Sequence, residues 1–296
     1  MIPPRSWLVL DMHYLCHRAF HVMGASGLGH GGTATSIIFS VLKSLGTLCE
    51  DLQSDRFVFC FDSKHKLREQ MFPGYKQGRR EKQRQQAGKY SAAERAAHAA
   101  QMTDFHIQIQ NLRNRLLPQA GFQNVLYQRG MEGDDLMAAF ALSRPKSEFV
   151  VLVTADNDLM QCLRNNVSLY NPTTRKVMDR DRFVGKWGIR PGKWARVKAI
   201  SGCSSDSIPG IRGVGEATAA KYLRGQLDCG TKTYQAITSE EGVAMLARNL
   251  PLVRLPLQGC VVGEPDEDAV TLQRWQEMCA SMGMRSIAGR PPLLNR

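Results

Sequence analysis

The chain lacks several features that would mark a secreted, membrane-spanning or zinc-ribbon protein. Its eight cysteines include no C-x-x-C pair, which predicts reduced thiols rather than disulfides or a thiolate metal site. No apolar run approaches the roughly 20 residues that span a bilayer, and the first residues lack the charged-then-apolar order of a signal peptide. We therefore expect a soluble cytoplasmic protein that makes no membrane contact.

Acidic residues are in short supply. The sequence has 27 Asp and Glu against 39 Lys and Arg, a formal net charge of +12 and a pI of about 9.5. This excess favours a polyanionic partner, and nucleic acid is the natural candidate. With 296 residues and 43% hydrophobic content, the chain can form one large domain or two unequal ones.

The few acidic residues gather where apolar runs end. Three runs, 7–11, 57–62 and 149–155, are rich in β-branched and aromatic residues and are apolar on both faces, as buried parallel strands are. Acidic residues end or follow these runs at Asp11, Asp62, Asp156 and Asp158. Because ligands bind at the carboxyl ends of parallel strands, we expect these carboxylates to share one rim of an α/β sheet.

Four further acidic residues complete the pattern. Glu132, Asp134 and Asp135 open an amphipathic stretch, and Asp206 follows a loop of small residues. Carboxylates brought together repel one another and raise several pKa values unless hard cations lie among them. The pattern therefore predicts a magnesium site, and the basic balance of the chain suggests phosphodiester chemistry. The alternative for residues 132–135 is that acids at a helix start favour the helix dipole.

Helical periodicity between the three runs indicates α/β order, and the composition changes after about residue 178. We therefore predict a catalytic domain over 1–178 and a helical domain over 179–296. Residues 64–101 interrupt the first domain, because ten Lys or Arg stand against three Glu between 64 and 95 and few large side chains are apolar. Such a segment is expected to be mobile on its own and to become ordered against phosphates.

One part of this insertion is predicted to bind a nucleic acid strand. Tyr75 and Lys76 precede Arg79, Arg80 and Lys82. An aromatic residue among cations can hold a strand end by stacking and charge. The plain alternative is a solvated basic face.

The segment IPGIRGVGEATAAKYL, residues 208–223, places Gly213, Val214 and Gly215 as a helix-hairpin-helix does. A tight glycine turn exposes backbone groups to a phosphate, and small residues let two helices pack closely. A dinucleotide-binding motif is disfavoured because no strand precedes the glycines. A plain turn between core helices is the alternative.

Five blocks, taken together and in this order, resemble the 5′-nuclease family. They are LVLDMHYLCHRAFHVMG, FDSKHKLREQMFPGYKQGRR, MEGDDLMAAFA, VTADNDLMQCL and KAISGCSSDSIPGIRGVGEATAAKYL. That family includes bacteriophage flap endonucleases and the 5′-to-3′ exonuclease domain of bacterial DNA polymerase I. The resemblance implies a PIN-like, mostly parallel α/β sheet flanked by helices, with a helical arch insertion at about 64–101. It also implies a C-terminal helical DNA-binding domain whose helix-hairpin-helix (H3TH) lies at about 206–223.

The resemblance further implies an activity. The expected enzyme is a metal-dependent flap endonuclease and 5′-to-3′ exonuclease that hydrolyses DNA phosphodiesters near 5′ single-strand/double-strand junctions in replication or repair. Its expected partner is DNA with a 5′ end or 5′ flap, with an RNA–DNA hybrid as a further substrate, and it is expected to be a monomer in a bacterial cytoplasm or a phage-infected cell. The expected cofactors are two Mg²⁺ ions, replaceable by Mn²⁺, and a K⁺ ion at the helix-hairpin-helix.

Individual residues receive roles from the same resemblance. The acids around the first metal are Asp11, Asp62, Glu132, Asp134 and Asp135, and those around the second are Asp156, Asp158 and Asp206. Lys76 and Arg79 are the expected catalytic cations, and Tyr75 is expected to stack on a base. The other DNA-binding positions are Arg18, Arg68, Arg80, Lys82, Gly213, Val214 and Gly215.

One departure from the family concerns the second metal site. The family has an aspartate after the glycine at 202, whereas this chain has Cys203, and Ser207 replaces the usual asparagine. A thiol is soft, usually protonated at neutral pH and a poor magnesium ligand, so the second site is expected to be weakened. Two alternatives stay open: a PIN-type ribonuclease, and a catalytically weakened protein that binds DNA junctions.

Overall fold

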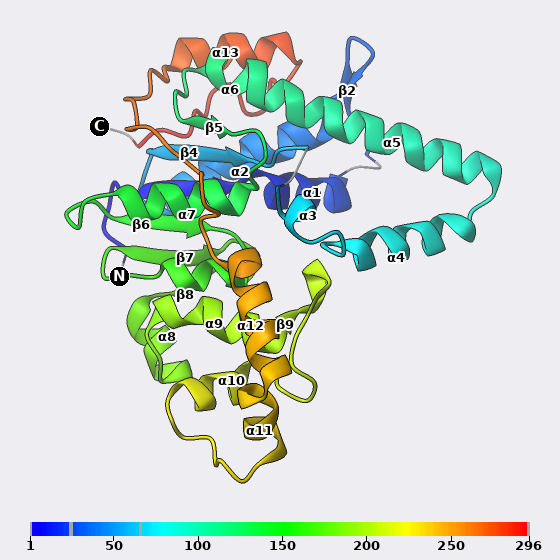
Figure 1. Ribbon diagram of the computed structural model, residues 1–296. Coiled ribbons are helices and arrows are strands. Elements are labelled where there is room, and N and C mark those ends of the chain that lie inside the picture. Colours follow the sequence, from blue (N-terminus) through cyan, green and yellow to red (C-terminus); the bar gives the residue numbers. More distant parts are fainter. Residues whose placement is uncertain (1, 24–25, 65–66, 295–296) are drawn as a thin grey trace.

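A mostly parallel β-sheet forms the centre of the molecule (Figure 1). The structure is a computed structural model and describes residues 2–23, 26–64 and 67–294. The strand order is β5 (Val125–Tyr127), β4 (Phe57–Phe61), β1 (Trp7–Asp11), β6 (Val150–Val153), β7 (Val167–Asn171) and β8 (Lys176–Met178). Neighbouring strands are parallel except at β8, which pairs antiparallel with β7. The predicted mostly parallel sheet is confirmed, and β1, β4 and β6 lie at the three predicted runs.

The register of the central strands explains why their acidic residues share an edge. Leu10 of β1 pairs with Phe59 of β4 on one side and with Val153 of β6 on the other. The three strands therefore end at nearly the same level. The residues that follow them leave the sheet together at its carboxyl edge, where open α/β sheets bind ligands.

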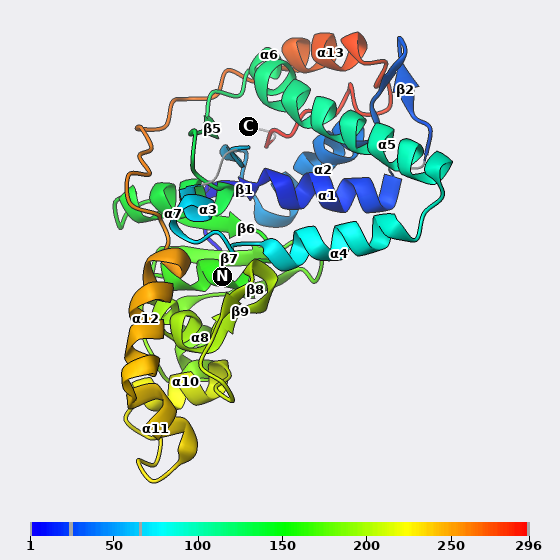
Figure 2. The same ribbon diagram turned by 45° about the vertical axis from the view of Figure 1, so that its right-hand side comes forward.

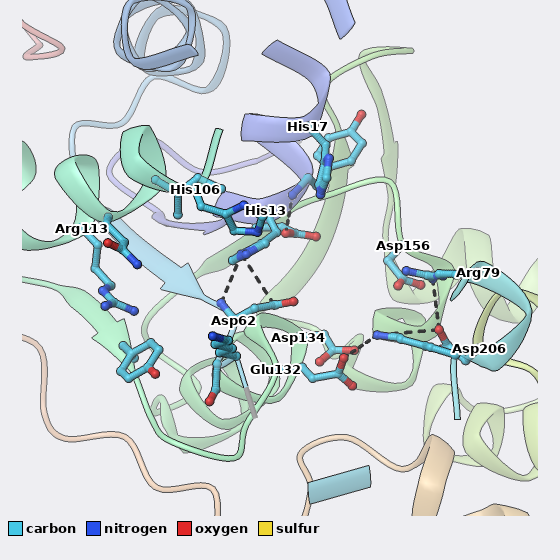
Figure 3. A pocket seen from close by; sticks show the side chains of 18 residues that line it. His13, His17, Asp62, Arg79, His106, Arg113, Glu132, Asp134, Asp156 and Asp206 are labelled. Atoms are coloured by element: carbon cyan, nitrogen blue, oxygen red, sulfur yellow. Dashed lines mark hydrogen bonds and ion pairs between the residues drawn. The ribbon is translucent and has the colours of Figure 1, made fainter. Parts of the chain in front are cut away.

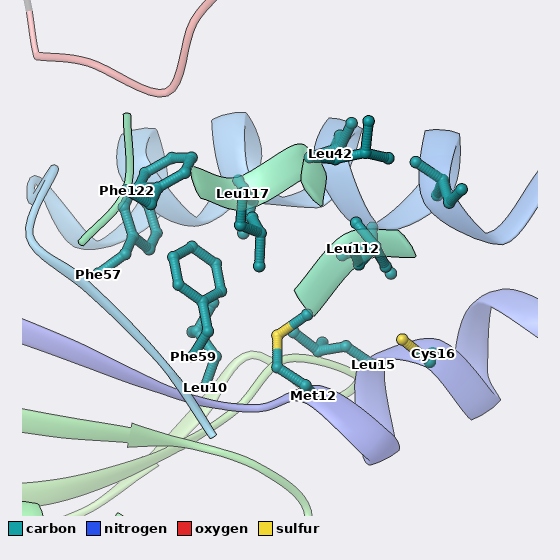
Figure 4. Close-up of a cluster of buried hydrophobic side chains, with 14 of the residues drawn as sticks. Leu10, Met12, Leu15, Cys16, Leu42, Phe57, Phe59, Leu112, Leu117 and Phe122 are labelled. Atoms are coloured by element: carbon teal, nitrogen blue, oxygen red, sulfur yellow. The ribbon is translucent and has the colours of Figure 1, made fainter. Parts of the chain in front are cut away.

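Successive side chains of a strand point to opposite faces of the sheet, and both faces are apolar here. Leu8 and Leu10 of β1 belong to a cluster with residues of α1 (Met12–Met23), α2 (Ser36–Leu52) and α6 (Leu117–Ala120), part of which is shown in Figure 4. Trp7 and Val9 belong to a second cluster, with residues of α7 (Gly133–Ser143). The sheet is therefore buried on both faces, which accounts for its continuously apolar strands.

Two helices project from the sheet as a hairpin that we call the arch: α4 (Gln77–Gly88) and α5 (Ala92–Asn111) (Figures 1 and 2). The short helix α3 (Leu67–Met71) precedes them. No residue of α4 is buried, and the buried residues of α5 all lie in its second half. Ser91 and Glu94 form a capping box at the start of α5, which supports a helix that has little packing there. The segment expected to be mobile on its own is thus helical, and its outer half projects away from the core.

A region of short helices lies below the sheet in Figure 1. Its elements are α8 (Arg180–Trp187), η3 (Pro191–Lys193), α9 (Trp194–Ser201), β9 (Gly202–Cys203), η4 (Ser204–Asp206), β10 (Ile208–Pro209), α10 (Glu216–Leu223), α11 (Lys232–Thr238) and α12 (Glu240–Val253). Phe183, Trp194 and Ile200 of this region share a hydrophobic cluster with Val9 and Leu152 of the sheet. The helical region is therefore packed firmly against the sheet.

The C-terminal helix returns to the sheet. Trp275 and Met278 of α13 (Leu272–Ser281) belong to the same hydrophobic cluster as Leu10, and α13 packs against α6. Trp275, Met278, Cys279 and Met282 are spaced as one apolar helix face, which explains this packing. The predicted helical domain covered all of 179–296, whereas the structure places α13 on the core of the first predicted domain.

Smaller elements complete the fold. The strands β2 (Gly29–His30) and β3 (Thr33–Ala34) form a hairpin, the π-helical turn η1 (Leu112–Leu116) joins α5 to α6, and the 3₁₀ segment η2 (Asn157–Cys162) follows β6. All eight cysteines are free thiols. Among the described residues, no helix has both the length and the apolar character that crossing a membrane requires.

Candidate metal centre and its cationic neighbours

A cavity of about 1010 Å³ lies at the carboxyl edge of the sheet, and Figure 3 shows the side chains that line it. Six of the eight predicted metal-binding acids are among them: Asp11, Asp62, Glu132, Asp134, Asp156 and Asp206. Asp135 and Asp158 are not part of this lining, and each makes an ion pair described below. The structure therefore brings carboxylates that are distant in sequence into one cavity.

Asp11 ends β1 and is fixed by two hydrogen bonds. The amide of Tyr14 donates to its Oδ1 and the hydroxyl of Thr154 donates to its Oδ2, both at 2.9 Å. Burial is the main cause that raises the pKa of Asp11 to about 7, and the charge of Asp62 adds to it. A nearby divalent cation would favour the ionised form, so this carboxylate is suited to be a metal ligand.

Asp62 follows β4 and approaches the start of α7. The amide of Gly133 donates to Asp62 Oδ1 at 2.7 Å. A Cβ atom at position 133 would lie 3.0 Å from that oxygen and 3.3 Å from the carbonyl oxygen of Cys60, so glycine allows the close approach. On its other side, the amide of Asp62 donates to His13 Nδ1 at 3.2 Å.

Glu132, Asp134 and Asp135 each offer a carboxylate oxygen within 4.8 Å of the others. Glu132 and Asp135 also form a capping box at the start of α7, so the helix-dipole interpretation applies to them as well. Asp134 has no such role: its Oδ1 is buried and has no hydrogen-bond partner among the described residues. Burial, followed by the charge of Asp135, holds the pKa of Asp134 well above its usual range. A buried carboxylate oxygen without a partner is what a site for a hard cation requires.

Arg68 is a buried structural residue, which corrects its predicted role in DNA binding. It is 2% exposed, and its NH1 and NH2 atoms donate to Asp135 Oδ2 at 2.5 Å and Oδ1 at 2.7 Å. Its Nε donates to the carbonyl oxygen of Leu252 at 2.8 Å. Asp135, which is 0% exposed, also accepts from the amide of Leu257 at 2.7 Å. The pair therefore supports the acidic centre from within the protein, and DNA cannot reach Arg68.

Tyr75 is also buried, which contradicts the prediction that it stacks on a base. It is 2% exposed, and its ring belongs to a cluster with Ile208 and Leu252. Its hydroxyl donates to Glu132 Oε2 at 2.6 Å. Tyr75 therefore orients a predicted metal ligand instead of presenting its ring to a substrate.

Lys76 and Arg79 lie in the cavity lining, as expected for cations that meet a phosphate. Lys76 Nζ pairs with Glu132 Oε1 and lies 3.7 Å from Asp206 Oδ1. Arg79 NH2 lies 3.0 Å from the same Asp206 oxygen. The backbone of Lys76 has a positive φ of 56°, and its amide donates to the carbonyl oxygen of Asp206 at 2.7 Å. The arch is thus anchored to the Asp206 loop next to the acids.

The remaining predicted basic positions are exposed. Arg80 donates to the carbonyl oxygen of Tyr75 at 2.8 Å, and Lys82 lies on the exposed surface of α4. Arg18 lies on an exposed position of α1. Each is accessible to a phosphate backbone, and their predicted DNA contacts stay predictions.

Two of the three acids predicted around the second metal, Asp158 and Asp206, lie beside Cys203, and the ligand atoms of these three residues lie within 4.8 Å of one another. Cys203 Sγ is 3.6 Å from Asp206 Oδ2 and 3.9 Å from Asp158 Oδ2. Burial and these two carboxylates raise the pKa of the Cys203 thiol to about 11. The thiol therefore stays protonated at neutral pH, and it occupies a place where a carboxylate would bind magnesium.

Lys198 is a residue of this site that sequence reasoning missed. Its Nζ lies 3.0 Å from Asp158 Oδ1 and 3.1 Å from Glu216 Oε1, and the residue is 8% exposed. Burial, followed by the charge of Asp156, raises the pKa of Asp158 to about 6, while Lys198 acts in the opposite direction. The pattern K-A-I-S on an apolar helix gave no sign that the lysine points inward to an aspartate.

Sequence reasoning also missed Arg113 and Tyr127, which line the cavity. In Figure 3, Arg113 lies on the opposite side of Asp62 from Arg79 and Asp206. His17 and His106 line the cavity too, and burial lowers the pKa of His17 to about 4, so its ring is neutral at pH 7. The His17 ring packs against Phe105 of the arch with ring centroids 4.5 Å apart.

The glycine segment forms a turn between α9 and α10. The amide of Val214 donates to the carbonyl oxygen of Ile211 at 3.0 Å, and the amide of Ile211 donates to that of Ile200 at 2.8 Å. Gly213 has a φ of 79°, and no atom lies within 4 Å of the place where its Cβ would be. Val214 is 4% exposed, whereas Gly213 and Gly215 are exposed. Contacts at Gly213 and Gly215 would therefore be made by the backbone of the turn.

Comparison with known proteins agrees with this geometry. The family model described as "5'-3' exonuclease, N-terminal resolvase-like domain" matches residues 6–188. DNA polymerase I of Thermus aquaticus is 29% identical over 223 residues, which cover 75% of this chain and 24% of that protein. DNA polymerase I of Mycobacterium leprae is 28% identical over 284 residues, which cover 90% of this chain and 28% of that protein. The chain thus spans about a quarter of the length of these relatives.

Solved structures show the same fold. The zinc-bound structure of the 5′-exonuclease of T5 matches with a TM-score of 0.66 and 22% identity, covering 85% of this chain and 90% of that one. Flap endonuclease-1 from Methanococcus jannaschii matches with a TM-score of 0.60 and 14% identity, covering 98% of this chain and 91% of that one. The family model covers more than half of the chain, and its range contains the sheet and every acidic residue of the cavity lining except Asp206. The chain is a member of the 5′–3′ exonuclease family.

Proposed function

We propose that this chain is a divalent-metal-dependent 5′-nuclease that hydrolyses DNA near the junction of a 5′ single strand and a duplex. The observation that carries the proposal is the cavity in which six acidic residues converge beside Lys76 and Arg79. Few other chemistries need so many carboxylates next to cations, whereas phosphodiester hydrolysis needs metal ligands and positive charge at one place.

The donor set fits magnesium. Asp11, Asp62, Glu132 and Asp134 would hold the first ion, and the partnerless Oδ1 of Asp134 supports this assignment. Asp156, Asp158 and Asp206 would hold a second, weaker ion, with Mn²⁺ as a substitute for Mg²⁺. When bound, such ions supply an activated water and stabilise the charge of the leaving oxygen.

The protein's own residues prepare the substrate. Lys76 and Arg79, both near Asp206, place positive charge where a scissile phosphate would gather negative charge. Asp135 is assigned a supporting role, since both of its oxygens are engaged by Arg68. Tyr75 fixes Glu132 through its hydroxyl.

The DNA contacts follow from the surfaces on either side. The exposed backbone of Gly213 and Gly215 between α9 and α10 would hold a duplex phosphate as a helix-hairpin-helix does, with a K⁺ ion as a further ligand. Arg18, Arg80 and Lys82 would meet the backbone of the substrate. We propose that the protein acts as a monomer in the cytoplasm of a bacterium or phage-infected cell, on DNA with a 5′ flap and on RNA–DNA hybrids.

The test is cleavage of a 5′-labelled flap DNA by the purified protein in Mg²⁺ and in EDTA. Asp62→Asn and Asp134→Asn should abolish cleavage in Mg²⁺ while flap binding, measured by fluorescence anisotropy in EDTA, persists. Unchanged turnover of either variant would refute the metal assignment. Lys76→Ala should lower kcat more than affinity, because its charge is needed at the reacting phosphate.

Two outcomes would favour other functions. Faster cleavage of single-stranded RNA than of flap DNA would indicate a ribonuclease. Tight junction binding without cleavage in Mg²⁺ or Mn²⁺ would indicate a binding protein whose metal chemistry is lost.

Affinity for the junction should fall steeply with salt. The slope of log K against log [salt] should be about −0.9 for each neutralised phosphate of a duplex.

A further inference from the structure

Arg113 and Tyr127 form a wall between two cavities. Both residues line the acidic cavity, and both also line a neighbouring pocket of about 370 Å³. The guanidinium carbon of Arg113 lies 3.9 Å from the centre of the Tyr127 ring. The proposed reaction uses the other end of the acidic cavity, near Asp206, so this end and the pocket behind it are left without a role.

The backbone places Arg113 there by an unusual turn. The long helix from the arch passes through the π-helical turn Leu112–Leu116 before it continues as α6. Leu112 and Leu116 are both 0% exposed and belong to the core cluster of Figure 4. A π turn inside an α-helix is less stable than the regular helix and occurs frequently at functional sites. The core therefore fixes a turn that directs Arg113 to the junction of the two cavities.

The electrostatic surroundings of Arg113 differ from those of the other lining cations. Lys76 and Arg79 are held by carboxylates of the acidic centre. Arg113 donates from Nε to Asn114 Oδ1 at 2.9 Å, and no carboxylate of the described residues lies within 4.0 Å of it. Its terminal nitrogens thus have no acceptor among the described residues and can bind an anion. Beside it, Tyr127 is 44% exposed and offers an aromatic face.

We propose that Arg113 and Tyr127 form a subsite for the single-stranded nucleotides on the 5′ side of the cleaved bond. A planar guanidinium binds a phosphate through two donors, and an aromatic ring beside it stacks on a base. The proposal rests on the proposed nuclease function, because a duplex held at the turn between α9 and α10 would enter on the Asp206 side. A strand that crosses the acids from that side leaves the cavity at Arg113 and reaches the second pocket.

Flap length provides the test. The substrates are DNAs whose 5′ flap grows from a blunt end to about eight nucleotides, within the range of known single-strand site sizes. The wild-type KM should fall as the flap lengthens. Arg113→Ala and Tyr127→Ala should raise KM about tenfold for long flaps, as the loss of one stacked or charged contact does, and should leave KM for the blunt end and kcat unchanged. Tyr127→Phe keeps the ring and should behave like the wild type.

Arg115→Ala is the matched control. It removes the same charge from the same turn, but Arg115 lines neither cavity and donates to the sulfur of Met282. The control should therefore keep the flap-length dependence. An unchanged flap-length dependence in Arg113→Ala and Tyr127→Ala, or an equal loss on blunt and flapped DNA, would overturn the subsite.

A binding measurement separates this inference from the proposed function. Fluorescence anisotropy with a fluorescein-labelled single-stranded DNA in EDTA requires no catalysis. If the wild type failed to cleave any 5′ substrate, the nuclease proposal would fall. About tenfold weaker single-strand binding by Arg113→Ala would still support the subsite, and equal binding would overturn it.

Discussion

Arg68 and Asp135 meet beneath the acidic cavity through two hydrogen bonds of 2.5 and 2.7 Å, and neither side chain is accessible to solvent to more than 2%. They come from α3 and α7, and Arg68 also bonds to the carbonyl oxygen of Leu252 at the end of α12. The pair thus joins the insertion, the sheet domain and the helical region at one point. A residue that looks like a DNA-binding cation in the sequence acts as an internal connection.

Breaking this pair should destabilise the protein strongly. Arg68→Met and Asp135→Leu should each lower the free energy of unfolding by about 3–5 kcal/mol, because each leaves a buried charge without its partner. The double variant should recover part of the loss, since it removes both charges. Urea denaturation measures the free energy of unfolding of all three variants. Additive losses in the double variant would contradict an interaction between Arg68 and Asp135. Arg80→Met, which removes an exposed pair with Glu69, is the control and should cost less than about 1 kcal/mol.

Tyr75→Phe should affect stability rather than DNA affinity. The hydroxyl that donates to Glu132 at 2.6 Å is lost, and a buried carboxylate loses a donor, which costs about 1–3 kcal/mol. The buried ring is kept, so the affinity for flap DNA in EDTA should match that of the wild type. Weakened DNA binding at unchanged stability would contradict this prediction and show that the Tyr75 hydroxyl contributes to substrate binding.

Cys203→Asp should lower the Mg²⁺ concentration that gives half-maximal cleavage. The thiol lies 3.6 Å from Asp206 Oδ2, and a carboxylate there would add a hard ligand to the second metal group. Cys203→Ser has nearly the same size without the charge and should resemble the wild type. The measurement is the rate of flap cleavage over a Mg²⁺ titration, and identical titrations for the wild type and Cys203→Asp would show that the missing ligand has no effect.

Magnesium should raise the thermal stability of the protein. The folded state gathers carboxylates whose pKa values are raised by burial, and a bound cation relieves this cost. A cation at 100 times its dissociation constant adds about 2.7 kcal/mol, which for a chain of this size raises Tm by about 2–4 °C per kcal/mol. Asp134→Asn should reduce the shift seen by calorimetry with Mg²⁺ against EDTA. An equal shift in that variant would place the ion elsewhere.

The sequence predicted the parts of the site that depend on strand order. Buried parallel strands have a recognisable apolar pattern, and the acids at their ends must lie at one edge once the strands are aligned. Asp11, Asp62 and Asp156 were therefore found without a structure. The strands β5, β7 and β8 were not, because they are short or only partly buried and give weaker apolar runs.

The directions of long side chains could not be predicted in the same way. Arg68 and Tyr75 belong to a stretch that is basic on average, and their burial depends on Leu252 and Ile208, which are far away in sequence. Lys198 reaches Asp158, and Arg113 reaches the junction of the two cavities, because of how α9 and the π turn are packed. The packing of α13 against the core of the sheet domain could not be predicted either, because an apolar helix face does not show which surface the helix covers.

The arch is attached to the rest of the protein at its base. Gln108 of α5 accepts hydrogen bonds from the amides of Ile37 and Ile38 at 2.9 and 3.3 Å, and so ties the inner half of the helix to the start of α2. The outer half has no comparable attachment in the part of the chain that the structure describes. Thermal bending should therefore displace the tip of the arch, while the stretch beside the acids keeps its position. The tip can then meet an incoming strand over a wide area, and its movement does not disturb the reacting groups.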